Sequence, residues 1–543
     1  MAESEAVVQS DLRGSGRVGK RLKGRSLAAS RLGWWGPIVA MLIGGLVRAW
    51  NVGTPASLVF DESYYVKQAY SMTQYGVELY VDPALGGTTP NAMFEAGTLN
   101  VFTTAGDLVV HPPLGKWLIA MGQLAFGAQN SYSWRAAALV AGMLTILIVG
   151  RIALRLTGSA YYGTLAAGLL AVEGTHVVVS RTGILDSFLT LFVVGAFACL
   201  VADRFAGRAK LASALAHEVG TAASALGPYV GGRWWRVGAG VLLGMAAATK
   251  WSALPFIAIF GIMTVLWDMN ARRRAGISRW FAGTLSRDAV PAFVSIVGAA
   301  LVVYLLSWSG WFASSLGWGR RWADEHPATG IDLLLPGPLR SLIHYHEEMW
   351  RVSTSLTTSH PYATNPIGWF FQERPTLFFL RQTTEGAPGC PAGGGGPCME
   401  MVTSLGTLSI WYAGVIAVVA LVILYIADRQ WHSRLRFQPD WILGASLSGI
   451  LAGYVPWLLV GDRTVYSFYS VVFVPWVVLC IVVALHRLEG RDWTTRRYRL
   501  ARSLGVALLV TSIVLLAWFW PVLTGQKLTH AEWLARMWLS SWH

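Results

Sequence analysis

Two adjacent carboxylates, Asp61 and Glu62, stand near the start of a polar segment that separates two apolar stretches. The segment, Phe60 to Lys116, is rich in glycine, threonine and asparagine. Neighbouring residues on a regular element point in different directions, so we do not expect the two acids to form a symmetric pair. One can act as a base while the other orients or holds an acceptor, or both can be solvated acids at a helix start. This segment is the candidate active-site loop.

Several cations occupy positions where a membrane protein does not usually place them. Arg135, Arg181, Lys250 and Arg463 fall at the predicted outer ends of apolar segments, and Lys116 closes the polar loop. Cations at such places are often paired or functional, although each one can also extend its side chain to lipid headgroups. Arginine binds phosphate through two parallel hydrogen bonds and lysine binds it as a point charge. The set predicts a phosphate-binding ring beside the two acids.

One base and several cations suit transfer from a lipid-linked sugar phosphate. The departing phosphate is weakly basic and needs its charge stabilised, whereas the attacking hydroxyl needs a base. A glycosidase instead places two carboxylates on either side of the bond. His111 can contact the phosphate or the acceptor, or only cap the structure, and Arg181 and Asp186 can form a structural ion pair. With no Asp-x-Asp motif and no histidine cluster, we expect no cofactor and do not favour a divalent metal.

The composition indicates a membrane protein with many spans. The chain has 543 residues, of which 54% are hydrophobic and 13% charged, and a mean hydropathy of +0.47. A soluble domain carries about 25% charged residues. The net charge of +14 resides mainly in short connections between apolar runs, as the positive-inside rule predicts for cytoplasmic loops, so nucleic acid is not the expected partner.

The apolar runs predict an all-α polytopic protein with about eleven transmembrane helices and a large first outer loop containing interfacial helices. Arginine clusters on alternate connections place the N-terminus in the cytoplasm and Asp61 outside. The predicted spans are 34–50, 134–156, 161–172, 184–202, 237–248, 252–269, 289–311, 405–427, 441–460, 465–485 and 506–522, and 117–126 is predicted to be an interfacial helix.

The predicted division of the chain follows from these spans. A basic cytoplasmic tail, 1–33, precedes a transmembrane core, 34–312, that includes the catalytic loop, 51–130. An extracytoplasmic loop, 313–403, then leads to C-terminal helices, 404–523, and an outer tail, 524–543.

The four cysteines fall into two groups. Cys199 and Cys480 lie in apolar runs and are expected to be inert packing residues, whereas Cys390 and Cys398 flank a glycine-rich stretch in a polar loop. A disulfide can form there if the loop is extracytoplasmic, but the sequence does not fix the geometry.

An ordered set of motifs resembles the protein O-mannosyltransferases, polytopic enzymes of the GT-C glycosyltransferase class. The motifs are Phe60-Asp61-Glu62 with Lys67 following, His111-Pro112-Pro113-Leu114-Gly115-Lys116, Trp134-Arg135-Ala136, Arg181-Thr182-Gly183-Ile184-Leu185-Asp186, Ala248-Thr249-Lys250-Trp251, Thr357-Thr358-Ser359-His360-Pro361-Tyr362 and Arg463-Thr464-Val465-Tyr466-Ser467-Phe468-Tyr469. The segment 313–403 is too short for the MIR domain of the eukaryotic members, so the chain resembles the bacterial, actinobacterial type.

The resemblance implies inverting transfer of mannose from polyprenyl-phosphate mannose to Ser or Thr of a translocating protein at the plasma membrane. It assigns the base to Asp61, with Glu62 beside it, and places Arg135 near the lipid phosphate. Lys67, His360 and Tyr469 become supporting candidates. Membrane lipid and the protein translocon are the further partners to expect.

Two other functions remain possible from the residues. A related GT-C enzyme can pass a lipid-linked sugar to a lipid or cell-wall glycan with the same base and cations. A transporter is less favoured, because transporters place polar groups near the membrane midplane at broken helices, whereas the ionisable groups here gather toward one face.

Overall fold

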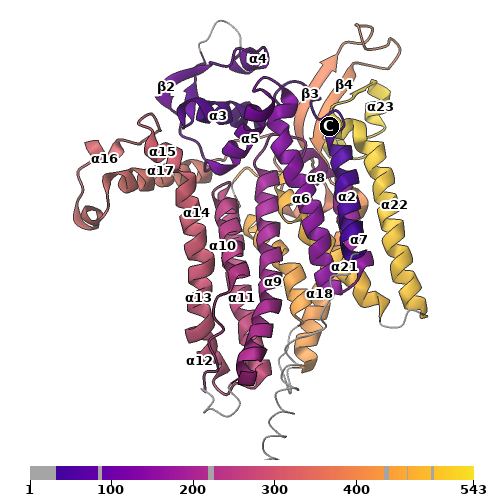
Figure 1. Cartoon of the computed structure of the whole chain (residues 1–543). Helices are drawn as coiled ribbons and strands as arrows, with labels where there is room; N and C mark the ends of the chain where they lie inside the picture. The colour runs from indigo at the N-terminus through magenta and orange to yellow at the C-terminus, as the bar shows by residue number, and fades with distance from the viewer. Residues whose placement is uncertain (1–31, 84–88, 218–224, 433–439, 462, 491–493) are drawn as a thin grey trace, which may run out of the picture.

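The computed structural model describes residues 32–83, 89–217, 225–432, 440–461, 463–490 and 494–543. A bundle of near-parallel helices is capped at one end by a layer of short helices and two small sheets (Figure 1). The predicted basic tail lies almost entirely outside the described residues. The N-terminal end of α2 and the last described residues lie at opposite ends of the bundle.

The bundle consists of helices whose sequences are mostly apolar. They are α2 (Leu32–Ala49), α6 (Ser131–Thr157), α7 (Ala160–Ala171), α9 (Asp186–His217), α10 (Trp234–Ala247), α11 (Leu254–Ala275), α12 (Trp280–Thr284), α13 (Val290–Phe293) and α14 (Ala299–Ser307), α18 (Leu408–His432), α19 (Trp441–Gly453), α20 (Val455–Leu458), α21 (Val474–Glu489) and α22 (Arg496–Thr524). The π-helical turns η2 (Leu285–Ala289) and η3 (Val294–Gly298) join α12, α13 and α14 into one rod.

The most buried helices form the centre of this bundle. About 78% of the apolar window of α9 and all of the first ten residues of α21 are buried, as expected for helices surrounded by other helices. Each of the eleven predicted spans overlaps at least one helix. Six helices in the described part of the chain are long and apolar enough to cross a membrane, and three more are apolar but shorter. The protein is thus a multi-helix membrane protein, and the count of eleven spans stays a prediction.

A layer of short elements covers the end of the bundle where the polar loop begins. It contains α3 (Glu62–Tyr75), α4 (Pro90–Glu95), α5 (Leu114–Phe126) and an antiparallel pair, β1 (Leu79–Val81) and β2 (Phe102–Gly106). α5 matches the predicted interfacial helix and packs on α3 and α6. The sequence did not predict the strands, because each is too short to show a clear alternation of apolar and polar residues.

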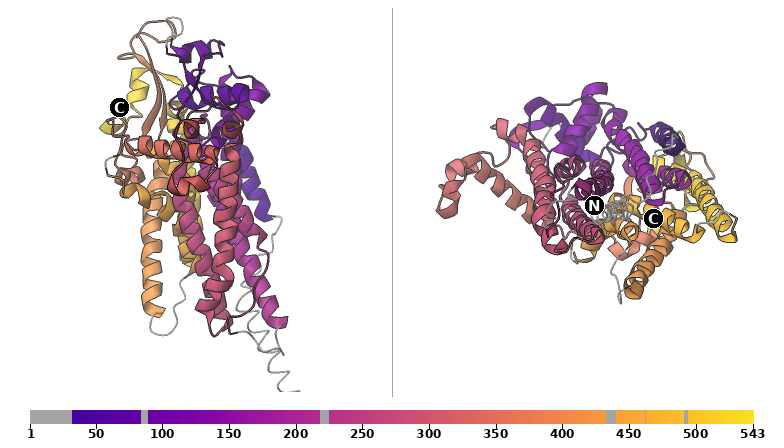
Figure 2. Two further views of the ribbon diagram at one scale, coloured as in Figure 1. Left: turned by 90° about the vertical axis from the view of Figure 1, so that its left-hand side faces the viewer. Right: turned by 60° about the horizontal axis from the view of Figure 1, so that its bottom comes forward.

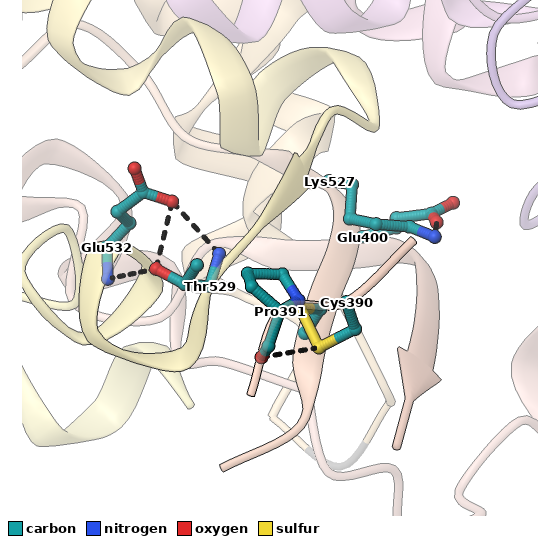
Figure 3. The surroundings of a disulfide bond; sticks show 7 residues. Cys390, Pro391, Glu400, Lys527, Thr529 and Glu532 are labelled. Carbon is teal, nitrogen blue, oxygen red and sulfur yellow. Dashed lines mark hydrogen bonds and ion pairs between the residues drawn. A yellow bond between two sulfur atoms is a disulfide. The ribbon is translucent and has the colours of Figure 1, made fainter. Parts of the chain in front are cut away.

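A second sheet lies beside this layer and joins distant parts of the chain. β3 (Thr376–Thr383), β4 (Cys398–Ser404) and β5 (Lys527–Leu528) pair antiparallel in the order β3-β4-β5. A disulfide joins Cys390, in the β3–β4 connection, to Cys398, the first residue of β4, and Lys527 pairs with Glu400 at 3.2 Å (Figure 3). The disulfide that the sequence left open is therefore formed.

An arm leaves the bundle at the C-terminal end of α14, on the side of the layer of short elements. It contains α15 (Ser309–Ala313), α16 (Trp322–Glu325), the short helix η4 (Gly330–Leu334) and α17 (Gly337–Thr354). Figure 1 and the right view of Figure 2 show the arm projecting sideways, and in Figure 1 α17 runs across the direction of the spans. A small core fixes the base of the arm, and its buried members are Val77, Leu79, Trp308, Trp311, Leu342, Tyr345 and Met349.

Candidate active site

The Asp61 side chain is held at the start of α3 without capping that helix. Phe60 adopts a left-handed backbone conformation (φ 49°) and stacks on Phe378 of β3 with 4.7 Å between ring centroids. Asp61 is the N-cap residue, yet its carboxylate makes no hydrogen bond to the helix backbone. The Tyr65 hydroxyl, one turn later, donates to Oδ2 of Asp61 at 3.3 Å. The half-buried carboxylate is therefore oriented by Tyr65 and is not used to cap α3.

Glu62 has a different environment, because its carboxylate is fully buried and fully bonded. Both oxygens accept from the Arg135 guanidinium at 2.8 Å, and the backbone N–H groups of Val59 and Gly183 also donate to them. The remaining Arg135 N–H groups donate to the carbonyls of Val52, Pro55 and Ser57. All five guanidinium donors are thus used within the protein.

This geometry corrects two expectations. Arg135 is 1% exposed and has no free N–H to offer a phosphate, so it does not fit the predicted phosphate-binding role. Each carboxylate oxygen of Glu62 already accepts two hydrogen bonds within the protein, so Glu62 does not fit a direct role on the substrate either. The pair instead joins α6 to the start of α3, and this fixes the backbone next to Asp61.

Asp186 pairs with Lys250 rather than with Arg181. The Lys250 ammonium lies 3.0 and 3.1 Å from the two carboxylate oxygens of Asp186, and 4.5 Å from the ring centroid of Tyr469. The Arg181 guanidinium instead donates to the carbonyls of Arg48, in the last turn of α2, and of Trp50 and Asn51, just after that helix. Asp186 thus forms the structural ion pair that the sequence allowed, but with Lys250, while Arg181 bonds carbonyls at a helix end that lack partners within the helix.

Electrostatics place Asp61 in the same site as this pair. Burial raises the pKa of Asp61 to about 6, with the Asp186 charge adding to the rise and the Lys250 cation and the Tyr65 hydrogen bond opposing it. Burial, reinforced by Lys250, holds the pKa of His111 well below its usual range. Near neutral pH the site therefore contains an ionised Asp61 of raised basicity and an uncharged His111.

Two other predicted cations support the loop instead of facing the site. The Lys116 ammonium is fully buried, 2.5 Å from Glu78, and it donates to the His111 carbonyl at 2.9 Å. It thereby orients the backbone of His111, so the predicted phosphate contact of Lys116 does not fit. Lys67 bonds to the Ser63 carbonyl and the Asn91 side chain, and burial lowers its pKa to about 8.

Arg463 is a predicted cation that opens onto two cavities. Its Nε donates to the Ser353 carbonyl at 2.9 Å, and no hydrogen bond involves its terminal nitrogens within the ranges described. It lines one cavity of about 380 Å³ and a second of about 130 Å³, where His360, Tyr466 and Tyr469 also lie. Tyr469 also lines a small cleft beside Asp186 and Lys250. These spaces are connected through shared lining residues, since Arg463 borders both cavities, Tyr469 borders the smaller cavity and the cleft, and Lys250 borders the cleft.

The sequence missed some members of this site. Tyr65 stands four residues after Asp61 on the same helix face, a spacing that could have identified it. Trp457 borders both the cleft and the larger cavity, but it resembles any other interfacial tryptophan in the sequence. No group of three or more metal-ligating side chains occurs among the residues that the structure describes. Metal independence remains a prediction.

Comparison with known proteins identifies the family. The sequence matches the family described as dolichyl-phosphate-mannose-protein mannosyltransferase over residues 38–307, and the C-terminal four-span region of protein O-mannosyltransferase over residues 338–542. The chain is similar to three curated polyprenol-phosphate-mannose–protein mannosyltransferases. That of Mycolicibacterium smegmatis strain MKD8 is 35% identical over 94% of this chain and 93% of its own, that of Mycobacterium tuberculosis 34% over 91% and 87%, and that of Corynebacterium glutamicum 34% over 92% and 90%.

A solved structure shares the fold. The Pmt1–Pmt2 protein O-mannosyltransferase complex of S. cerevisiae, bound to its sugar donor, aligns with a TM-score of 0.69 at 14% identity, over 95% of this chain and 93% of that one. The matches cover both the N-terminal half, with its acid pair, and the C-terminal helices. They confirm the family that the motifs predicted: the chain belongs to the protein O-mannosyltransferases.

Proposed function

We propose that the protein transfers mannose from polyprenyl-phosphate mannose to Ser or Thr hydroxyls of proteins, with Asp61 as the general base. Family membership supports the reaction, and one structural observation supports the residue. Of the two adjacent acids, only Asp61 keeps a carboxylate that is not committed to a salt bridge.

The step is a single displacement. The acceptor oxygen attacks the anomeric carbon of mannose and its proton moves to Asp61, while the bond between that carbon and the phosphate oxygen breaks and the phosphate leaves with the electron pair. Attack opposite the leaving group inverts the anomeric carbon. A base with a pKa of about 6 is largely ionised near neutral pH and is more basic than an ordinary aspartate, which favours proton transfer.

Lys250 and Arg463 replace Arg135 as the proposed ligands of the donor phosphate. Lys250 is shared with Asp186 and so stays fixed, and Arg463 presents terminal N–H groups toward the connected cavities. Cations held in place before the reaction stabilise the departing charge without reorganisation. His111, kept uncharged, is suited to a hydrogen bond with the phosphate or with the acceptor.

We also propose that the active-site end faces away from the cytoplasm at the plasma membrane. The Cys390–Cys398 disulfide lies at that end, and structural disulfides persist in oxidising compartments. The end of the bundle opposite to the active site carries basic residues, since α11 ends there at Arg272–Arg274 and the rod Trp280–Ser307 starts there. The positive-inside rule places such residues in the cytoplasm. An acceptor emerging from the translocon would then meet the site directly.

The proposal is tested with Asp61→Asn in purified protein, using polyprenyl-phosphate mannose and a Ser/Thr peptide, with and without chelator. We expect transfer to fall by about 100-fold or more, because the base is lost. Asp324→Asn, which changes an exposed acid on the arm, is the matched control and should keep the wild-type rate.

Two results would contradict the proposal. If the Asp61→Asn protein transferred mannose at the wild-type rate, Asp61 would not be the base. Efficient mannosylation of a lipid or glycan acceptor, with none of the peptide, would keep the donor chemistry but change the acceptor.

A further inference from the structure

The tip of the arm carries an exposed apolar cluster. Ile331, Leu333 and Leu334 of η4 are 79%, 71% and 80% exposed, and the neighbouring Leu335 is also exposed. Large apolar side chains that cluster in one exposed segment usually mark a contact surface. The tip is therefore expected to contact an apolar partner.

The position of the tip favours the lipid bilayer as that partner. After α16 the chain hooks back toward the level of the outer end of α14 before α17 returns to the bundle (Figure 1). The rod Trp280–Ser307, from which the arm emerges, is the least covered of the long apolar helices, with 17% of its apolar window buried. Its exposed Leu301, Val302 and Leu306 show that this side of the bundle faces lipid. The tip thus continues an existing lipid-facing surface.

The middle of the arm has side chains typical of headgroup depth. Trp322 stacks between His326 and His344 with centroid distances of 4.2 and 4.5 Å, and Trp318 stacks on His344 at 5.6 Å. Tryptophan is enriched where hydrocarbon meets water, since its ring is apolar and its N–H is polar. An apolar tip followed by aromatic residues closer to the bundle is the arrangement expected for a segment that lies in the membrane–water interface.

The base of the arm contacts two segments of the active site. The Trp251 Nε1–H donates to the Tyr304 hydroxyl at 3.0 Å, and that hydroxyl lies 2.7 Å from Nε2 of His346 on α17. The other ring nitrogen of His346 lies 2.7 Å from the Leu342 carbonyl, which can only accept, so Nδ1 carries the proton and Nε2 accepts from Tyr304. Trp251 directly follows Lys250 in the chain.

The second contact is made by Tyr345, the neighbour of His346 on α17. Its hydroxyl accepts from the Val109 N–H at 3.1 Å, two residues before His111. α17 therefore holds both the Lys250 turn and the His111 segment from one side.

We propose that the side chains of Ile331, Leu333, Leu334 and Leu335 insert into the outer leaflet of the bilayer and that α17 uses this anchor to brace Lys250 and His111. Insertion is argued from the position and side chains of the arm, whereas the effect on transfer rests on the proposed function. His346 and Tyr345 are positioning residues, since they act through Trp251 and Val109 without touching a substrate.

Insertion is tested by spin labelling of the full chain in phosphatidylglycerol-containing nanodiscs. A label at Leu333→Cys should collide more often with oxygen than with a water-soluble nickel chelate. A label at Thr98→Cys, exposed in the outer layer away from the arm, should show the reverse. Nickel accessibility at Leu333 equal to that at Thr98 would overturn insertion. Strong dipolar coupling between Leu333 labels of two molecules would assign the tip to a second copy and also overturn it.

The brace is tested by replacing Ile331, Leu333 and Leu334 with serine. Transfer in nanodiscs should fall by roughly 2- to 30-fold relative to wild type, the range found for residues that couple distant sites. In detergent micelles, where there is no leaflet, the variant and wild type should differ little. An equal loss in both media would indicate general damage and overturn the brace, as would no loss in either. Because spin labelling needs no enzymatic activity, failure of the proposed function would be recognised separately.

Discussion

Replacement of Glu62 should destabilise the protein, although Glu62 adjoins the proposed base. Its carboxylate is fully buried and accepts four hydrogen bonds, two of them from Arg135. Removing one partner of a buried ion pair costs about 3–5 kcal/mol, because the other charge is left without compensation. Glu62→Ala should therefore lower the free energy of unfolding by about that amount. Glu62→Gln should cost less, since it keeps the volume but turns one acceptor into a donor facing Arg135.

The assay is the thermal unfolding midpoint in detergent, followed by tryptophan fluorescence, together with the fraction that elutes monodisperse. Asp61→Asn is the matched variant, and it should not lower the midpoint, because burial already disfavours the charged form of Asp61. The reasoning would be refuted by a Glu62→Ala protein that unfolds at the wild-type midpoint but has lost transfer. That result would mean that Glu62 acts on reactants and not on the fold.

Three further predictions concern the site. The kcat/KM of the wild type should fall as pH drops through about 6, since protonated Asp61 cannot accept the acceptor proton; a rate independent of pH in this range would contradict the base. Lys250→Met should move this fall to higher pH, because Lys250 lowers the pKa of Asp61, and an unchanged pH profile would show that Lys250 does not influence the pKa of Asp61. Arg463→Ala should raise the KM for the lipid-linked donor by about 10-fold, whereas Arg381→Ala, on the exposed hairpin, should leave it unchanged; equal donor KM values in wild type and Arg463→Ala would exclude a phosphate contact.

The sequence predicted the membrane bundle well because each span carries its own signal. An apolar run needs no partner to be recognised, and each of the eleven predicted runs overlaps at least one helix. The family was also predictable, since its motifs are local and keep their order along the chain.

Partners were harder to predict, because side-chain pairing is decided in three dimensions. The sequence showed that these cations stand at unusual positions, but it could not show their partners. Arg135 pairs with Glu62 across 73 positions and Lys250 with Asp186 across 64. A charged residue that ends a span looks the same in the sequence whether it binds a substrate or satisfies buried carbonyls. The sheet was missed for a related reason: β5 has two residues and finds β4 only after the bundle has formed.

That small sheet has a consequence for how the protein matures. Phe60, next to Asp61, stacks on β3, β3 pairs with β4, and β4 pairs with β5, which follows α22. The Gly525 N–H also donates to the Met401 carbonyl, so the turn after α22 is tied to the same strand. The sheet that supports Phe60 and Asp61 is therefore completed only when residues 525–528 have reached the same end of the bundle as Asp61. A chain still being inserted already contains Asp61, Lys250 and Arg463, but it should remain inactive until its last helix is in place.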